Sequence, residues 1–346
     1  MIKIGIVGTG NTVGIAHYHA HGLIMDGRAE ISAVFDTRLD GASQWVHEHN
    51  LNSRICTSYE ELLENVDAVN ICVPNMFHCE YAIKAIESNK HFLVEKPMAV
   101  NLEDSQRIHQ TAYGFGKVNM VGFVYRYANA VKLTKKVVEE RIGKVFTLTS
   151  WFGGKRLSDP TVGLEWRMVR KRSGSGALGD FGSHLIDLAD YVAGQRYDTI
   201  ACQTGRFIPK RATSYGYAEI ENDDAAVFIA KGPHGLGSFS VSRVGFDDLM
   251  LLITGEGGMV QVSLRDGGEV TYWEKRPEGG YTGKVERLEF APQIPFEGWF
   301  EAEMTNYLDA IEGSAVDYPK VEQGFYVEKL LDCAEKTFNR GEMGKI

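Results

Sequence analysis

The first 124 residues alternate short apolar runs with amphipathic stretches, and this alternation constrains the fold more than any other feature of the chain. The run at 68–73, Ala-Val-Asn-Ile-Cys-Val, is nearly continuous in apolar residues, which indicates a strand buried on both faces. Such strands belong to a parallel sheet covered by helices. We predict a doubly wound α/β domain over residues 1–124, with strands at 2–7, 31–35, 54–56, 68–73, 91–94 and 118–124.

From about residue 145 the pattern changes to longer strands, several of them separated by turn signals such as Asp-Gly-Gly and Glu-Gly-Gly. We predict that residues 125–346 form an α+β domain with a large, mainly antiparallel sheet. Its predicted strands are 145–152, 200–207, 225–230, 237–243, 250–254, 259–264, 269–274 and 285–290. Predicted helices lie at 128–141, 177–193, 299–311 and 323–339. This domain is expected to bind substrate and to carry oligomer contacts.

Charge and cysteine content narrow the class of protein. A formal net charge of −9 argues against nucleic-acid binding, which needs an excess of Lys and Arg. The basic run 167–172 is the exception: we interpret it first as a solvated loop, second as a contact with a substrate or cofactor phosphate, and last as a nucleic-acid patch. The five cysteines are scattered without metal-site spacing, and no apolar stretch is long enough for a membrane. We expect a cytoplasmic protein.

The first strand runs into a glycine-rich turn and then into the helical pattern 15–25. Glycines let the backbone approach a pyrophosphate, and the amides of a helix N-terminus face its charge. This arrangement predicts a Rossmann nucleotide site. The third glycine of the G-x-G-x-x-G pattern falls at Val13, one residue before Gly14. The turn positions expected to contact the cofactor are Gly8, Gly10, Asn11, Thr12 and Val13.

Asp36 ends the second predicted strand, 22 residues after Gly14. A carboxylate there accepts hydrogen bonds from the ribose hydroxyls of adenosine and repels a 2′-phosphate, which favours NAD. Arg38 lies two residues further on and suits a 2′-phosphate, so NADP stays an alternative. His17, His19 and His21 look metal-like, but only His17 and His21 share a helix face and no carboxylate nearby completes a set, so no metal site is expected.

Two later strands end in polar residues at the same predicted edge of the sheet. Val73, Pro74, Asn75 and His78 follow the fourth strand, and Glu95, Lys96 and Pro97 follow the fifth. Ligands of open α/β sheets bind beyond the carboxyl ends of the strands, so we assign these residues to the cofactor site. A lysine placed there is costly unless it is used. The structural alternative is an ion pair of Lys96 with Glu95 or Asp180.

A glycine-rich segment, 174–182, leads into the predicted helix that carries Asp180 and His184 at positions i and i+4. An imidazole that acts as a general base needs an orienting partner, and a carboxylate one turn away supplies it. The alternative is a capping Asp and a hydrogen-bonded core His.

The glycine turn, the Glu95-Lys96-Pro97 run and the Gly179-Asp180-x-x-x-His184 segment resemble, in this order and at these separations, the glucose–fructose oxidoreductase, inositol 2-dehydrogenase and rhizopine-catabolism (Gfo/Idh/MocA) family. The resemblance extends to residues 122–127 and to the C-terminal pattern 300–313. It implies a homodimeric or homotetrameric NAD(P)-dependent dehydrogenase that acts on a secondary hydroxyl of a sugar, inositol or related polyol.

The resemblance also implies roles. His184 takes the hydroxyl proton, Lys96 hydrogen-bonds the same oxygen, and Asp180 helps to bind substrate. Further candidates for the substrate pocket are Tyr125, Arg126, Trp166 and Arg167, since aromatic and Arg groups suit sugar faces and acidic substituents. Two other functions stay open: an enzyme of the same fold that keeps and recycles tightly bound NAD, and a non-catalytic NAD(P)-binding sensor.

Overall fold

The computed structural model describes residues 1–10, 14–276, 278, 281–338 and 344–345. The chain divides into two compact units. The first contains Met1–Val124, Lys171–Ser173 and Ile294–Tyr326, and the second contains Tyr125–Arg170, Gly174–Gln293 and Val327–Ile346. Each unit is described by itself.

The first unit is built on a six-stranded parallel sheet with the order β3-β2-β1-β4-β5-β6, the strand order of a Rossmann domain. The predicted parallel sheet is confirmed. Apolar side chains such as Ile4, Ile6 and Phe92 are completely buried, as expected for strands covered on both faces. The strands are β1 (Ile2–Val7), β2 (Ala29–Phe35), β3 (Arg54–Ile55), β4 (Ala68–Ile71), β5 (His91–Glu95) and β6 (Asn119–Gly122).

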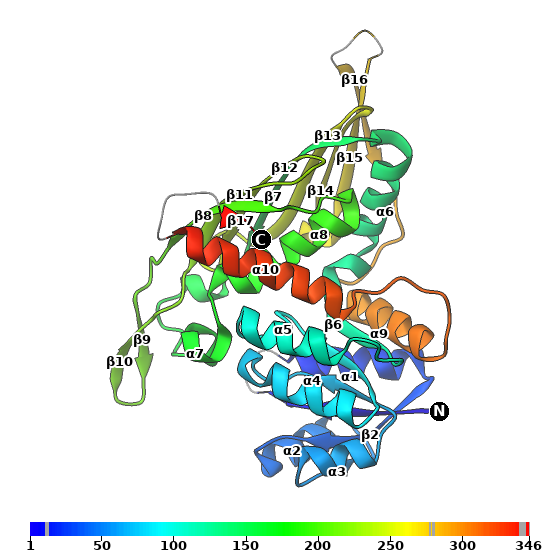
Figure 1. Ribbon diagram of the computed structural model, residues 1–346, viewed down its shortest axis with the longest axis vertical. Coiled ribbons are helices and arrows are strands. Elements are labelled where there is room, and N and C mark those ends of the chain that lie inside the picture. Colours follow the sequence, from blue (N-terminus) through cyan, green and yellow to red (C-terminus); the bar gives the residue numbers. More distant parts are fainter. Residues whose placement is uncertain (11–13, 277, 279–280, 339–343, 346) are drawn as a thin grey trace. The chain divides into compact units, whose positions relative to one another are not determined.

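Helices alternate with these strands along the chain, namely α1 (Ile15–Asp26), α2 (Leu39–Glu48), α3 (Tyr59–Glu64), α4 (His78–Glu87) and α5 (Leu102–Thr111). A helix from far along the chain, α9 (Glu297–Ile311), completes the unit by packing on α1 (Figure 1). The two helices approach closely at Gly22, where a Cβ atom would lie 2.6 Å from the carbonyl oxygen of Phe300. The ring of Phe300 stacks on Tyr18 at 5.2 Å.

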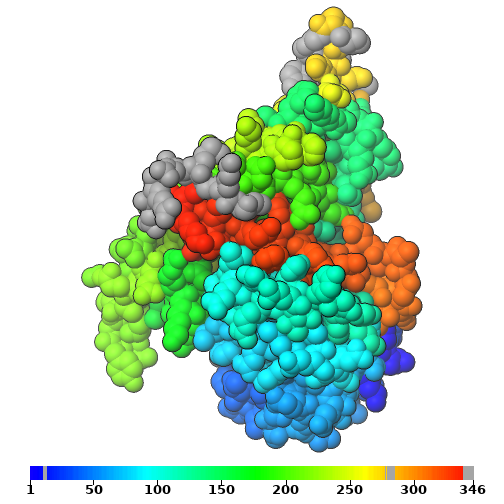
Figure 2. Space-filling model, viewed as in Figure 1, coloured from blue at the N-terminus to red at the C-terminus, as the bar shows by residue number. Residues whose placement is uncertain are grey.

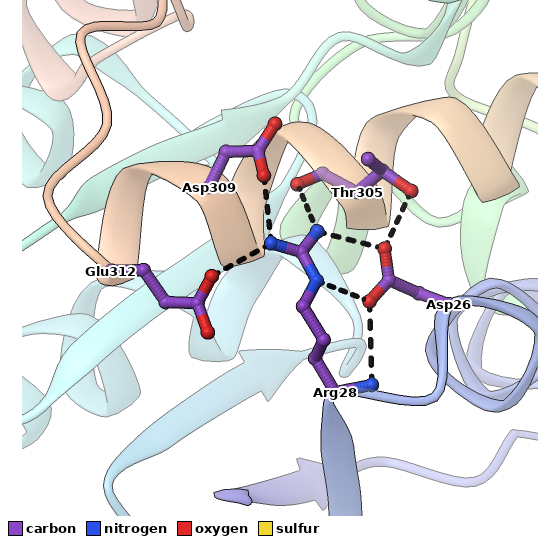
Figure 3. Close-up of polar contacts among 5 residues, drawn as sticks. All are labelled: Asp26, Arg28, Thr305, Asp309 and Glu312. Atoms are coloured by element: carbon purple, nitrogen blue, oxygen red, sulfur yellow. Dashed lines mark hydrogen bonds and ion pairs between the residues drawn. The ribbon is translucent and has the colours of Figure 1, made fainter.

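One arginine joins the start of β2 to α9 (Figure 3). The Arg28 guanidinium donates to both carboxylate oxygens of Asp26, at 2.7 and 2.8 Å, to Asp309 at 2.7 Å and to Glu312 at 2.8 Å. The Thr305 hydroxyl in turn donates to Asp26 at 2.8 Å. Hydrogen bonds from Arg28 lower the pKa of Asp26 and those with the carboxylates raise the pKa of Arg28. The network therefore fastens α9 to the end of α1 and the start of β2.

The second unit contains a nine-stranded sheet with the order β16-β15-β14-β13-β7-β12-β11-β8-β17. All its pairs are antiparallel except β12 with β7, so the mainly antiparallel α+β expectation is confirmed. Helices α6 (Asn129–Val137) and α8 (Ser183–Ala193) cover one face (Figure 1). The strands are β7 (Val145–Gly153), β8 (Thr199–Gly205), β11 (Ala225–Lys231), β12 (Leu236–Ser242), β13 (Asp248–Gly255), β14 (Gly258–Ser263), β15 (Glu269–Lys275), β16 (Tyr281–Leu288) and β17 (Gly344–Lys345).

Sequence patterns did not predict the hairpin of β9 (Lys210–Thr213) and β10 (Gly216–Glu219), which protrudes from the second unit (Figure 2). Its strands have only four residues each, which is too short to show the apolar alternation that marks a strand. The buried Arg211 anchors the hairpin by donating to the carbonyl oxygens of Leu157 and Asp159.

Two predicted helices differ in their winding. The segment predicted as a helix over 128–141 is α6 followed by a π-helical turn, Val138–Ile142. The segment predicted over 177–193 begins with a π-helical turn, Leu178–Gly182, before α8. The C-terminal helix α10 (Val321–Phe338) matches the prediction within two residues at its start, and residue 339 lies outside the described residues. None of the helices described is long and apolar enough to span a membrane.

Replacing Arg28 by Ala removes the donors that join Asp26 to α9. We expect the free energy of unfolding to fall by about 1–3 kcal/mol, because three carboxylates lose a charged donor in a partly exposed setting. Chemical denaturation measures this change. Lys84→Ala, which removes exposed ion pairs with Glu60 and Glu80, is the matched control and should cost less than about 1 kcal/mol. Equal losses in the two variants would contradict the role assigned to Arg28.

Candidate active site

The glycine turn after β1 adopts the backbone that its sequence requires. Gly8 and Gly10 have φ values of 87° and 69°, in the left-handed region that favours glycine. A Cβ atom at Gly8 would lie 2.8 Å from the backbone nitrogen of Val73, so the turn also packs closely on the loop after β4. Gly14 then precedes the first turn of α1. The predicted positions Asn11, Thr12 and Val13 lie outside the described residues.

Asp36 lies directly after β2 and is fixed against the turn. Its Oδ2 atom accepts hydrogen bonds from the backbone amide and the hydroxyl of Thr9, at 2.9 and 3.0 Å. Its Oδ1 atom accepts from the Arg38 amide at 2.9 Å, and the Arg38 Nε atom lies 3.9 Å away. The half-exposed Arg38 therefore lies beside the carboxylate, so both residues that the sequence singled out for the adenosine end are neighbours.

His78 joins the loops that follow β4 and β5. Its Nε2 atom lies 2.8 Å from the carbonyl oxygen of Val73 and its Nδ1 atom lies 2.9 Å from that of Pro97. The imidazole is buried, and burial lowers the pKa of His78. Pro74 leads into the buried Asn75, whose side-chain amide donates to the carbonyl oxygen of Ser173 at 3.0 Å. The two predicted cofactor loops are thus held together, and the peptide bond between Lys96 and Pro97 is cis.

The three histidines of α1 have separate environments. His17 contacts His49 at 2.7 Å, His21 contacts Glu301 at 2.8 Å, and His19 is completely buried with its Nε2 atom 2.9 Å from Glu95 Oε1. Within the described part of the chain, no cluster of three or more His, Cys, Asp or Glu side chains is arranged to hold a metal ion. The sequence patterns did not indicate a contact between His19 and Glu95, because 76 residues separate them.

A buried carboxyl group on α9 lies close enough to Glu95 to feel its charge. Glu303 is completely buried, and neither of its oxygens has a hydrogen-bond partner among the residues that the structure describes. Burial, and then the charge of Glu95, raise the pKa of Glu303 well above its usual value. Both effects favour the protonated, neutral form of the carboxyl group.

In the second unit, Asp180 and His184 lie where a π-helical turn runs into α8. His184 is almost completely buried, and the edge of its ring meets Tyr125 with 4.5 Å between centroids and an interplanar angle of 80°. Burial, and then the charges of Asp180 and Asp247, raise the pKa of Tyr125. Single π turns inside helices occur frequently at functional sites. The predicted acid–base residues therefore share one buried corner with the predicted pocket residue Tyr125.

Two residues that sequence patterns did not single out hold this corner in place. Arg243, at the end of β12, donates to Asp180 Oδ2 at 3.3 Å and to the carbonyl oxygen of Arg167 at 3.1 Å. The carboxylate of Asp223 accepts from the amides of Gly176 and Leu178, at 2.7 and 2.8 Å. Both come more than 40 residues later in the chain, so no local signal points to them.

The remaining predicted pocket residues divide into two groups. Arg126 is buried in a bidentate pair with Asp187 of α8, at 2.7 and 2.5 Å, so its charge is matched inside the unit. Trp166 and Arg167 lie on a short 3₁₀ turn, and the Arg167 guanidinium stands over the Trp166 ring, 4.4 Å from its centroid. Burial lowers the pKa of Arg167.

The strand order, the glycine turn before α1 and the acidic residue directly after β2 are together the features of a Rossmann dinucleotide-binding domain. Residues 2–123 match the model of the oxidoreductase family with an NAD-binding Rossmann fold, and residues 130–261 match the GFO/IDH/MocA C-terminal domain. The chain belongs to the Gfo/Idh/MocA family, as its motifs predicted.

Known relatives include sugar dehydrogenases. The chain is 27% identical to glucose-6-phosphate 3-dehydrogenase of Bacillus subtilis, over 99% of this chain and 98% of that protein. It is 36% identical to levoglucosan dehydrogenase of Pseudarthrobacter phenanthrenivorans over 156 residues, which cover 45% of this chain and 40% of that protein. A solved levoglucosan dehydrogenase in complex with NADH and L-sorbose has the same fold, with a TM-score of 0.89 and 22% identity. The match covers 100% of this chain and 98% of that chain.

Glu303→Gln tests the neutral state of the buried carboxyl group. The pKa of Glu303 is higher in the folded than in the unfolded protein, so between the two values folding takes up a proton and stability falls as pH rises, by up to about 1.4 kcal/mol per pH unit. Gln keeps the shape and does not titrate. Denaturation between pH 5 and pH 8 should show the variant gaining stability relative to the wild type as pH rises. Two parallel curves would contradict a neutral Glu303.

Proposed function

We propose that this protein is a dehydrogenase that oxidises a secondary hydroxyl of a sugar, cyclitol or related polyol with NAD. The observation that carries the proposal is the buried corner of the second unit, where His184 and Asp180 lie at the head of α8 beside Tyr125. An imidazole and a carboxylate in such a position suit proton transfer from a hydroxyl group. Membership of an NAD-binding oxidoreductase family supplies the matching redox chemistry.

The relatives support the substrate class. Glucose-6-phosphate 3-dehydrogenase matches over almost the full length of the chain, and levoglucosan dehydrogenase has been solved with NADH and a sugar. Their names agree on a dehydrogenase that acts on a carbohydrate. Whether inositols are also substrates depends on the shape of the pocket rather than on the family motifs.

The proposed reaction converts a secondary alcohol into a ketone. The O–H and C–H bonds of one carbinol break, a C=O bond forms, and the two electrons of the C–H bond leave with the hydride. His184 accepts the hydroxyl proton, Lys96 donates a hydrogen bond to the same oxygen, and Asp180 binds a substrate hydroxyl and is held by Arg243. When bound, NAD supplies the hydride acceptor at C4 of its nicotinamide ring.

The cofactor is proposed to lie along residues of the first unit. Gly8 and Gly10 give the pyrophosphate close access to the backbone, and Asp36 accepts bonds from the adenosine ribose. Asn75 and Pro97 are proposed to lie near the nicotinamide. Asp36 disfavours a 2′-phosphate, and we therefore propose a preference for NAD over NADP although Arg38 is close by.

Tyr125, Trp166 and Arg167 are proposed to line the substrate pocket. Arg126 is proposed to support the pocket through its buried ion pair with Asp187. We also propose a cytoplasmic homodimer or homotetramer. All five cysteines are free thiols, which suits a reducing compartment. Exposed apolar side chains on the large sheet, among them Phe146, Val227 and Ile229, suit a face covered by another subunit.

The experiment that tests this function combines binding with turnover. Protein stripped of nucleotide is titrated with NAD and NADP and then screened against inositols, aldoses, sugar phosphates and sugar acids by absorbance of the reduced nicotinamide. We expect NAD to bind more tightly and at least one polyol to be oxidised. Tight binding of NAD without turnover of any polyol would favour cofactor recycling or a sensor and would contradict the dehydrogenase.

Lys96→Ala and His184→Ala should each lower kcat by about two orders of magnitude or more, because each removes a group that acts on the reacting oxygen. The dissociation constant for NAD, measured by fluorescence, should stay within about threefold in the His184 variant. Lys275→Ala and His234→Ala change the same residue types at exposed positions and serve as controls. Wild-type turnover in either test variant removes that residue from the proposed chemistry.

A further inference from the structure

We propose that His19 is a positioning residue, which fixes the Glu95 carboxylate and through it the backbone of Lys96. This inference rests on the proposed function, in which Lys96 acts on the reacting oxygen. His19 comes from α1, in a part of the chain that the proposed chemistry does not otherwise use. All the residues involved belong to the first unit.

The Glu95 carboxylate connects α1 with the loop after β5. Its Oε1 atom lies 2.9 Å from His19 Nε2, and its Oε2 atom accepts the backbone N–H of Lys96 at 3.2 Å. The His19 side chain is completely buried and that of Glu95 is 9% exposed, so water competes little for these contacts. The two oxygens of one carboxylate are therefore shared between a histidine and the amide of the proposed catalytic lysine.

The other ring nitrogen of His19 determines which tautomer is present. The side-chain amide of Asn70, on β4, donates to His19 Nδ1 at 3.1 Å and also reaches the sulfur of Met304 at 3.5 Å. An Nδ1 atom that accepts a hydrogen bond carries no proton, so the ring proton is on Nε2 and points at Glu95. Asn70, His19 and the Lys96 amide thus belong to one connected set of hydrogen bonds that converges on the Glu95 carboxylate.

The surroundings leave the carboxylate little freedom to move. A Cβ atom at Gly122, the residue paired with Glu95 on β6, would lie 2.7 Å from Glu95 Oε1. The Phe300 ring lies 5.4 Å from the His19 ring and closes the site on the α9 side. The buried Glu303 adds a second carboxyl group, close enough to feel the charge of Glu95. If the His19 donor were lost, Oε1 would stay buried without this hydrogen bond. The carboxylate would then have to turn away from the Lys96 amide to reach another donor.

A pair of substitutions separates positioning from packing. Gln places its amide nitrogen where His19 has Nε2 and can donate to Glu95, whereas Asn is shorter and reaches only the region of Nδ1. We expect His19→Asn to lower kcat about tenfold or more, with KM for NAD changed by less than about threefold. The primary deuterium isotope effect on kcat should rise, because hydride transfer becomes slower. His19→Gln should stay within about threefold of the wild type.

His21→Asn is the control, because His21 lies two residues further along α1 and pairs with Glu301 instead of Glu95. If His19→Asn does not fold, Glu95→Gln carries the test. This variant keeps the shape but turns an amide nitrogen toward either His19 Nε2 or the Lys96 amide, and it should lose kcat in the same way.

Equal kcat and Tm losses in His19→Asn and His19→Gln would overturn the proposal, since that outcome indicates packing alone. Wild-type kcat in a folded His19→Asn or Glu95→Gln variant would overturn it too. Failure of the proposed function looks different: the wild type would turn over no polyol, or Lys96→Ala would be as active as the wild type.

Discussion

The architecture depends on the burial of a parallel sheet. Strands buried on both faces need a helix between successive strands, and the same connection brings their carboxyl ends to one edge. The glycine turn after β1, Asp36 after β2, Asn75 after β4 and Lys96 after β5 all lie at strand ends of this kind. A single topological constraint thus gathers residues that are up to 88 positions apart in the chain, from Gly8 to Lys96.

Buried polar contacts then fix what the topology has gathered. Thr9 holds Asp36, His78 bridges the carbonyl oxygens of Val73 and Pro97, and Glu95 holds the Lys96 amide. In the second unit, Arg243 does the same for Asp180. Removing one partner of a buried hydrogen-bonded pair costs more than the bond itself contributes, so such contacts keep loops in one conformation. Hydrogen-bonded side chains therefore hold the loops that follow the strands of the first unit.

The sequence predicted the fold well because long apolar runs and turn glycines are local signals. It located both sheets and the helix that carries His184. It missed the β9–β10 hairpin, whose short polar strands are anchored by the distant Arg211. It also missed the contacts of His19 with Glu95 and of Arg243 with Asp180, because residues 63 or more positions apart form no local spacing pattern.

The central claim is that a hydride passes from a carbinol carbon of a carbohydrate to the cofactor. The most direct test incubates the protein and NAD with uniformly deuterated glucose, glucose 6-phosphate or methyl glucoside and analyses the nicotinamide by mass spectrometry. The account predicts one deuterium per reduced cofactor together with an equal amount of a keto sugar. Reduced cofactor without deuterium, or bound NAD that is never reduced by any carbohydrate, would contradict it.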